Sequence, residues 1–299
     1  MNLLLLLILG TIWGTSYLLI KVILVDVGPM TLVTGRLALS AIIIWALLRL
    51  RGTPFPRGRR LWTAYAVIGL LNGALPFTLI SWGELYISSG SAALLQATTP
   101  LFTILLAHVL TRDDRLTWSK VLGVVLGFVG VGLLMWPEVR QGFGSSAMGM
   151  LAIVASSLCY ALSAIFTRWR LQGQDPTTSS AGQFTMGLVY ILPLAFIFER
   201  PLAIRPSTTV IAAWLTLAIV CTVVAYIIYY ELLEKTSASY ATMVTYIIPV
   251  NGLILGAIFL TETLNSLVLL SLALVLCGVL LVKSTGPTLR TKVAVSVEQ

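Results

Sequence analysis

Charged residues are scarce in this chain, at 10% of 299 residues, whereas soluble domains carry roughly a quarter. The single histidine and the three cysteines show no metal-binding spacing and no disulfide framework. The net charge of +8 is spread over short loops rather than one patch, which argues against a nucleic-acid partner. Hydrophobic residues make up 58% instead, so we expect a lipid-embedded chain with the bilayer as a partner and without a cofactor.

Ten apolar stretches approach the length of about 20 residues that spanning a bilayer requires. Together they predict an all-α membrane protein with ten transmembrane helices and a disordered polar tail at 284–299. The predicted spans are Leu3–Leu24, Met30–Leu50, Leu61–Ile80, Ile87–Leu110, Leu116–Trp136, Met148–Thr167, Ser179–Phe198, Val210–Tyr230, Ser237–Leu260 and Leu264–Val282.

The basic residues predict the orientation. With the N-terminus inside, the outer loops receive only Arg140, Arg200 and Arg205, and the other loop lysines and arginines face the cytoplasm. This bias places both termini in the cytoplasm. Short loops and the lack of a targeting signal suit a bacterial inner membrane.

Two stretches of the chain repeat in one register. Pro249 follows Pro100 by 149 residues, and Glu262 follows Asp113 by the same distance. A second pair of segments, PMTLVTGR from Pro29 and PTTSSAGQ from Pro176, shares its proline, threonine and glycine. The chain thus divides into five-helix units at 1–137 and 141–283. Because five is odd, the second unit enters the membrane inverted.

The segments GTIWGTSYLLIK, the helix opening from Pro29 to Arg36, and AYIIYYELLEKTSASYATMVTYIIPVNGLILGAIFLTETL resemble the drug/metabolite transporter superfamily. They are similar to its EamA-type ten-helix branch, over nearly the whole chain, and more loosely to the aromatic amino acid exporters of the YddG type. The resemblance implies two inverted repeats around a central cavity lined mainly by helices 1, 3, 4, 6, 8 and 9. It also implies export of small metabolites.

Aromatic and polar side chains on these helices are the candidate substrate contacts. Trp13 is the one tryptophan away from the predicted membrane interfaces, and the tyrosines nearby would give stacking walls for flat or apolar solutes. Each of them also has a plain interpretation as helix packing or interhelical hydrogen bonding. The full candidate set is Trp13, Tyr17, Asn72, Gln96, Tyr160, Tyr226, Tyr230, Thr242, Thr245 and Tyr246.

Prolines and embedded charges complete the candidate residues. Pro100 and Pro249 each free the carbonyl four residues earlier, so the pair predicts matched hinges, with static kinks as the alternative. Arg36 is deep enough to need a partner, and an ion pair is the favoured interpretation. Lys21 lies near the outer end of helix 1, where it could reach the interface. No acid lies near mid-bilayer, which favours uncoupled transport over a proton relay.

The leading hypothesis is a secondary transporter that exports small organic metabolites, amino acids with apolar or aromatic side chains foremost, by alternating access. A multidrug or nucleotide-sugar carrier of the same fold is the alternative, although a sugar diphosphate would want more cavity cations than Lys21 and Arg36. A membrane-embedded enzyme is a weaker alternative, because it needs a nucleophile with a base or a metal cluster. The sequence leaves the oligomeric state open, a monomer included.

Overall fold

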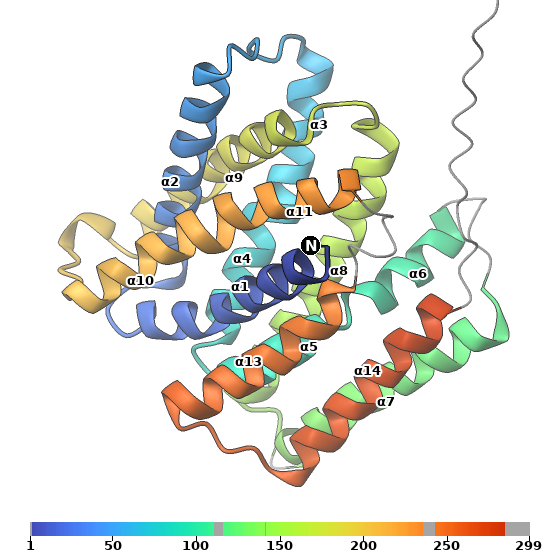
Figure 1. Cartoon of the computed structure of the whole chain (residues 1–299). Coiled ribbons are helices and arrows are strands. Elements are labelled where there is room, and N and C mark those ends of the chain that lie inside the picture. The colour runs from blue at the N-terminus through green and yellow to red at the C-terminus, as the bar shows by residue number, and fades with distance from the viewer. Residues whose placement is uncertain (1, 111–115, 141, 236–242, 285–299) are drawn as a thin grey trace, which may run out of the picture.

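The computed structural model describes residues 2–110, 116–140, 142–235 and 243–284, except for the side chains of 230, 233–235, 283 and 284. Helices account for nearly all of the described chain (Figure 1). Within these described ranges, eight helical segments are long and apolar enough to cross a membrane, and two more apolar helices are shorter. The all-α membrane class predicted from the sequence is confirmed.

The first half contains α1 (Asn2–Ile23), α2 (Pro29–Leu50), α3 (Arg59–Gly69), η1 (Leu70–Ala74), α4 (Leu75–Gly83), α5 (Ser89–Gln96), α6 (Thr99–Leu110) and α7 (Trp118–Arg140). The second half contains α8 (Ser145–Arg170), α9 (Pro176–Phe198), η2 (Pro201–Ala203), α10 (Thr208–Ala218), η3 (Ile219–Val224), α11 (Ala225–Lys235), α13 (Val244–Leu260) and α14 (Ser266–Ser284). The third predicted span is therefore α3, η1 and α4 joined end to end, and the eighth is α10, η3 and α11.

Helices of the two halves lie beside one another. In Figure 1, α1 runs through the middle with α13 and α5 along one side, and α2 lies against α9. The pair α7 and α14 forms an edge of the molecule, and glycines of α7 such as Gly123 and Gly130 pack there against α14 backbone. These glycines therefore serve packing within the chain, as the small residues of membrane helices commonly do.

The third helix of each half contains a π-helical turn that the sequence did not predict. The turns η1 and η3 begin at Leu70 and Ile219, which are 149 residues apart, the register of the paired prolines. In η3, the Thr222 hydroxyl donates to the carbonyl of Leu217 at 2.9 Å. Pro76, the second residue of α4, has no N–H to donate to the carbonyl of Asn72 in η1. The widened turns expose polar backbone inside the protein.

The fourth span is broken where the sequence predicted a hinge. Helix α5 ends at Gln96, and α6 starts at Thr99 with Pro100 as its second residue. Proline suits this position because its missing N–H would be unpaired in the first turn. The other copy differs, because Pro249 lies inside α13, which begins five residues earlier at Val244. The prolines thus occupy different places in their helices.

Acidic side chains cap three helix N-termini at the predicted outer face. Glu199, just after α9, accepts from the backbone N–H groups of Met30 at 2.9 Å and Thr31 at 2.7 Å, where α2 begins. Glu262, just after α13, accepts from the N–H groups of Ser89 and Gly90 at 2.7 and 3.0 Å, where α5 begins.

The third of these caps links two loops. The backbone N–H of Ser207, which precedes α10, donates to Asp26 at 2.9 Å, and this bond lowers the pKa of the Asp26 carboxyl. Carboxylates suit helix N-termini because of the unpaired N–H groups and the helix dipole. Glu262, which the repeat pairs with Asp113, thus anchors the start of α5. Asp113 lies outside the described residues.

A pair of glycines reveals the symmetry between the halves. Gly35 of α2 receives the ring of Trp214 from α10, and a Cβ atom on Gly35 would overlap that ring. Gly182 of α9, the residue that the sequence aligned with Gly35, receives the ring of Tyr65 from α3 in the same way. The indole N–H of Trp214 also donates to the carbonyl of Leu32 at 2.9 Å. Each half thus inserts an aromatic ring from its third helix against the second helix of the other.

We expect Gly35→Ala and Gly182→Ala each to lower the free energy of unfolding by about 1–3 kcal/mol, since overpacking in a tight core displaces side chains or backbone. Thermal unfolding of the purified protein in detergent measures this. Gly132→Ala is the matched control, because nothing lies within 4 Å of a Cβ atom there. Equal stability of all three variants would contradict the symmetric packing.

Candidate functional site

A cavity of about 240 Å³ lies between the two halves. Helices α1 and α13 form one side, while α4, α8 and the break between α5 and α6 form much of the rest. No acidic side chain is among the described residues that line it. The lining consists of Trp13, Ser16, Tyr17, Ile20, Arg36, Asn72, Phe77, Ile80, Gln96, Ala97, Thr99, Tyr160, Tyr226, Thr245, Ile248 and Pro249.

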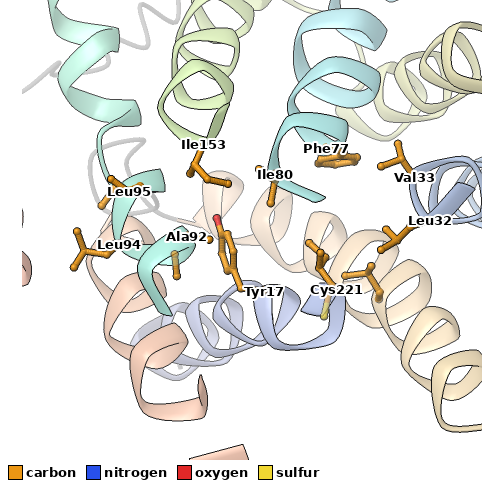
Figure 2. Packing of buried hydrophobic residues seen from close by; sticks show 14 of the residues in the cluster. Tyr17, Leu32, Val33, Phe77, Ile80, Ala92, Leu94, Leu95, Ile153 and Cys221 are labelled. Atoms are coloured by element: carbon orange, nitrogen blue, oxygen red, sulfur yellow. The ribbon is translucent and has the colours of Figure 1, made fainter. Parts of the chain in front are cut away.

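Aromatic rings make up a large part of the wall. Trp13 packs edge-on against Tyr226, with ring centroids 6.2 Å apart and planes at 74°. Phe77 meets Tyr160 in a similar way at 6.5 Å. Tyr17 projects from α1 between Ala92 and Cys221 (Figure 2). These rings offer both apolar faces and edges to a flat solute.

Arg36 is the one cation lining the cavity among the described residues, and it is 6% exposed. Its guanidinium carbon lies 3.9 Å from the ring centroid of Phe77, and its Nε donates to the Thr222 hydroxyl at 3.0 Å. No acid pairs with it in the described chain, so the expected ion pair is not observed. Because a guanidinium has five N–H donors, four remain available to an anionic group in the cavity.

Two tyrosine hydroxyls are similarly available. Tyr17 and Tyr160 both line the cavity, and neither hydroxyl makes a hydrogen bond to a described residue. Buried hydroxyls normally have a partner. With Arg36 they give the cavity one polar region, which a polar group of a solute would complete.

Asn72 joins the halves through a polar contact at η1. Its side-chain amide donates to the Gln183 carbonyl at 2.9 Å and lies 3.5 Å from the Tyr226 hydroxyl. Gln183 in turn donates to the backbone carbonyl of Asn72 at 3.2 Å. This is the carbonyl that Pro76 leaves without its helical partner, so the cross-contact satisfies it.

The two halves use the same arrangement here. Gln183 is the residue that the sequence aligned with Arg36. Arg36 contacts Thr222 of η3, as Gln183 contacts Asn72 of η1. In each case a polar side chain of the second helix binds the π turn of the other half. The second half has the uncharged Gln183 at this position, whereas the first half places the cation of Arg36 in the cavity.

Gln96 stabilises the break in the fourth span. Its amide donates to the hydroxyls of Thr99 and Ser157, both at 3.0 Å, and its side-chain oxygen accepts from Ser156 at 2.9 Å. The serines come from α8, in the other half. Gln96 therefore lines the cavity and also holds the helix ends in place.

Most of the predicted substrate contacts gather in this cavity, and a few do not. Lys21, predicted as an embedded charge rather than a substrate contact, also lies outside the cavity. It donates to the backbone carbonyls of Glu84 and Ile87, the latter at 2.8 Å, so it anchors the turn between α4 and α5. Tyr246 turns toward α14, where its hydroxyl donates to the carbonyl of Val279 at 3.2 Å. Thr242 and the side chain of Tyr230 lie outside the described residues.

The sequence reasoning missed two features. Phe77 was not selected, although the aromatic ring one residue after Pro76 was a usable signal. Glu84 falls between the third and fourth predicted spans, where a loop residue is expected. It does follow α4 directly, but it is fully buried and its carboxylate accepts no hydrogen bond from a described residue. Only the tertiary structure shows this burial, because helices of both halves cover the turn.

The helical membrane fold and its internal cavity are those expected of a membrane transporter. The EamA-like transporter family matches residues 1–136 and 147–284, and the chain belongs to this family, a branch of the drug/metabolite transporter superfamily. The chain is 26% identical to an "Uncharacterized transporter" of Archaeoglobus fulgidus, over 91% of this chain and 95% of that protein.

Two further relatives are also named as transporters. The chain is 23% identical to the "Uncharacterized transporter YoaV" of Bacillus subtilis, over 90% of this chain and 91% of that one. It is 28% identical to the "Uncharacterized inner membrane transporter YedA" of Escherichia coli, over 91% and 87% of the two chains. A crystal structure superposes with a TM-score of 0.67 at 18% identity, covering 94% of this chain and 95% of that one, which supports the fold.

Proposed function

We propose that this transporter exports small metabolites that carry a carboxylate and an apolar or aromatic side chain, amino acids foremost. The observation that supports this most is Arg36, a buried cation in the cavity without an acidic partner among the described residues. The unpaired hydroxyls of Tyr17 and Tyr160 and the rings of Trp13 and Tyr226 line the same cavity. A carboxylate would bind the cation while the side chain packs against the rings.

Cavity size and charge disfavour the alternatives. Pockets for drug-sized ligands usually measure roughly 300–1,000 Å³, and this one measures about 240 Å³. A nucleotide sugar carries two phosphates, and Arg36 is the single cation of the described lining. A small zwitterion or monocarboxylate fits better on both counts.

The proposed cycle is alternating access, with the two halves moving around the cavity and the broken fourth span as one hinge. The caps from Glu199 and Glu262 favour a state closed at the predicted outer face. We propose an inner membrane with both termini cytoplasmic, since the basic loops then face inward. The cavity is formed by one chain, so a monomer is the proposed transport unit, and it acts without proton coupling.

A transport assay tests this function. In proteoliposomes we expect flux of tryptophan, phenylalanine or leucine well above that of empty liposomes, little flux of a cationic dye or a nucleotide sugar, and the same flux with and without a pH gradient. Trp13→Ala should weaken the apparent affinity for tryptophan about 2- to 12-fold, since an aromatic contact is worth roughly 0.5–1.5 kcal/mol.

Trp118→Ala is the control for that variant, because Trp118 is 89% exposed and distant from the cavity lining. It should leave the affinity unchanged. Flux of the dye or the nucleotide sugar with no flux of any amino acid would overturn the proposed substrate class.

A further inference from the structure

A second cavity, of about 710 Å³, lies where α3 begins and α8 ends. It is distinct from the central cavity and shares none of its lining residues. It opens at the membrane face that carries most of the basic residues. Its walls come from α3 of the first half and α8 of the second. The lining residues are Arg57, Gly58, Arg60, Leu61, Thr63, Ala64, Val67, Phe166, Arg170 and Gln174.

Three of these residues are arginines. Arg57 and Arg60 have no hydrogen-bonding or ion-pair partner among the described residues. The guanidinium of Arg170 lies on the ring of Trp169, 4.1 Å from its centroid, and this contact leaves its N–H donors free. The carboxylate of Asp175 accepts from the N–H and hydroxyl of Thr178 at 2.6 and 2.7 Å and forms no ion pair with these arginines. The three arginines therefore have no ion-pair partner among the described residues.

The start of α3 adds further donors. Gly58 precedes the helix with a φ of 105°, a conformation that favours glycine, and no side chain caps the helix. The unpaired N–H groups of the first turn lie at the positive end of the helix dipole, which favours the binding of an anion. The three arginines and this helix end point to an anionic group at the mouth of the cavity.

Below the charges the wall is apolar. Leu61, Ala64 and Val67 are spaced three residues apart on one face of α3, and Phe166 of α8 lies opposite. A free inorganic anion would make no favourable contact with such an apolar surface. The acyl chains of a lipid would pack against it, and they lie directly below the lipid's phosphate.

The general excess of basic residues on the cytoplasmic side explains why arginines occur at this face. It does not explain why three converge on one cavity with an apolar floor between helices of different halves. Basic pockets between membrane helices bind the headgroups of anionic lipids.

We propose that this cavity binds an anionic phospholipid, with its phosphate on Arg57, Arg60 and Arg170 and its acyl chains along α3 and Phe166. The lipid would link α3 and α8, and hence the two halves, at the predicted cytoplasmic face. Both helices lead to the central cavity, because α3 continues into η1 with Asn72 and α8 contributes Tyr160.

Thermal unfolding of the full-length protein in a neutral detergent tests the site. Added phosphatidylglycerol should raise Tm by roughly 5–10 °C, as expected for a ligand near saturation, whereas phosphatidylcholine and inorganic phosphate should not. The triple variant R57Q/R60Q/R170Q should lose more than half of this shift. The control R49Q/R51Q/R168Q removes the same charge from exposed positions on the same face and should keep the shift.

A second measurement does not depend on the variants' folding. Phosphatidylglycerol with a photoreactive acyl chain should label the wild-type peptides that contain Leu61–Val67 and Phe166 above all others. The proposal is overturned if labelling spreads evenly over the lipid-facing helices, if both triple variants lose the shift equally, or if inorganic phosphate alone protects as well as the lipid.

Discussion

Arg36→Gln is expected to lower the apparent affinity for carboxylate-bearing substrates about 10- to 100-fold. A hydrogen bond to a charged group contributes roughly 1.5–3 kcal/mol. Glutamine is chosen as the replacement because Gln183 occupies the equivalent position in the other half. Within the described part of the chain, the buried guanidinium has one hydrogen bond, to Thr222, and it rests on Phe77. The measurement is concentration-dependent uptake into proteoliposomes, alongside thermal unfolding to show that the variant is folded.

A substrate change separates recognition from a structural effect. Tryptamine lacks the carboxylate of tryptophan, so the wild-type protein should prefer tryptophan, and Arg36→Gln should remove that preference. Arg36→Lys should restore it in part, because an ammonium keeps the charge without the planar pair of donors. If Arg36→Gln weakened transport of both compounds equally, Arg36 would be a structural residue and the carboxylate assignment would fail.

Glu262→Gln is expected to open the predicted outer face. The carboxylate accepts two backbone N–H bonds at the start of α5, and losing the charged cap of a helix costs about 0.5–2 kcal/mol. The population open to the outside should therefore rise roughly 2- to 30-fold. Spin labels at Leu85 and Leu264, both exposed, in a background without the native cysteines, would report a larger fraction of long distances.

Asp26→Asn is the matched control, since it weakens a carboxylate-to-N–H contact at the same face. That contact joins exposed loops, so the distance distribution should stay as in the wild type. An unchanged distribution in Glu262→Gln would instead show that the cap stabilises α5 without holding the outer face closed.

The sequence predicted the features that depend on composition and spacing. Apolar length located the spans, Pro100 located the break in the fourth span, and the scarcity of embedded charge singled out Arg36. These signals are local, because a proline or a buried cation has the same consequence in any membrane helix.

The remaining features depend on how distant helices meet. Tyr246 lies on α13, a helix that does line the cavity, but its side chain turns toward α14. The side of a helix that faces a cavity is set by the neighbouring helices. The burial of Glu84 follows from the helices that cover its turn. Asn72 in η1 lies four residues before Pro76, whereas the counterpart η3 contains no proline, so the sequence carried no matching signal there.

The two π turns have a consequence for the origin of the chain. A π turn adds one residue to an α-helix, and η1 and η3 carry that extra residue at the same register, 149 positions apart. One insertion before gene duplication explains both turns more simply than two later insertions at matching sites. The ancestral five-helix unit therefore already had the widened turn. Each π turn is bound by a side chain of the opposite half. A single five-helix unit would therefore leave its π turn without this contact, and two units supply it to each other.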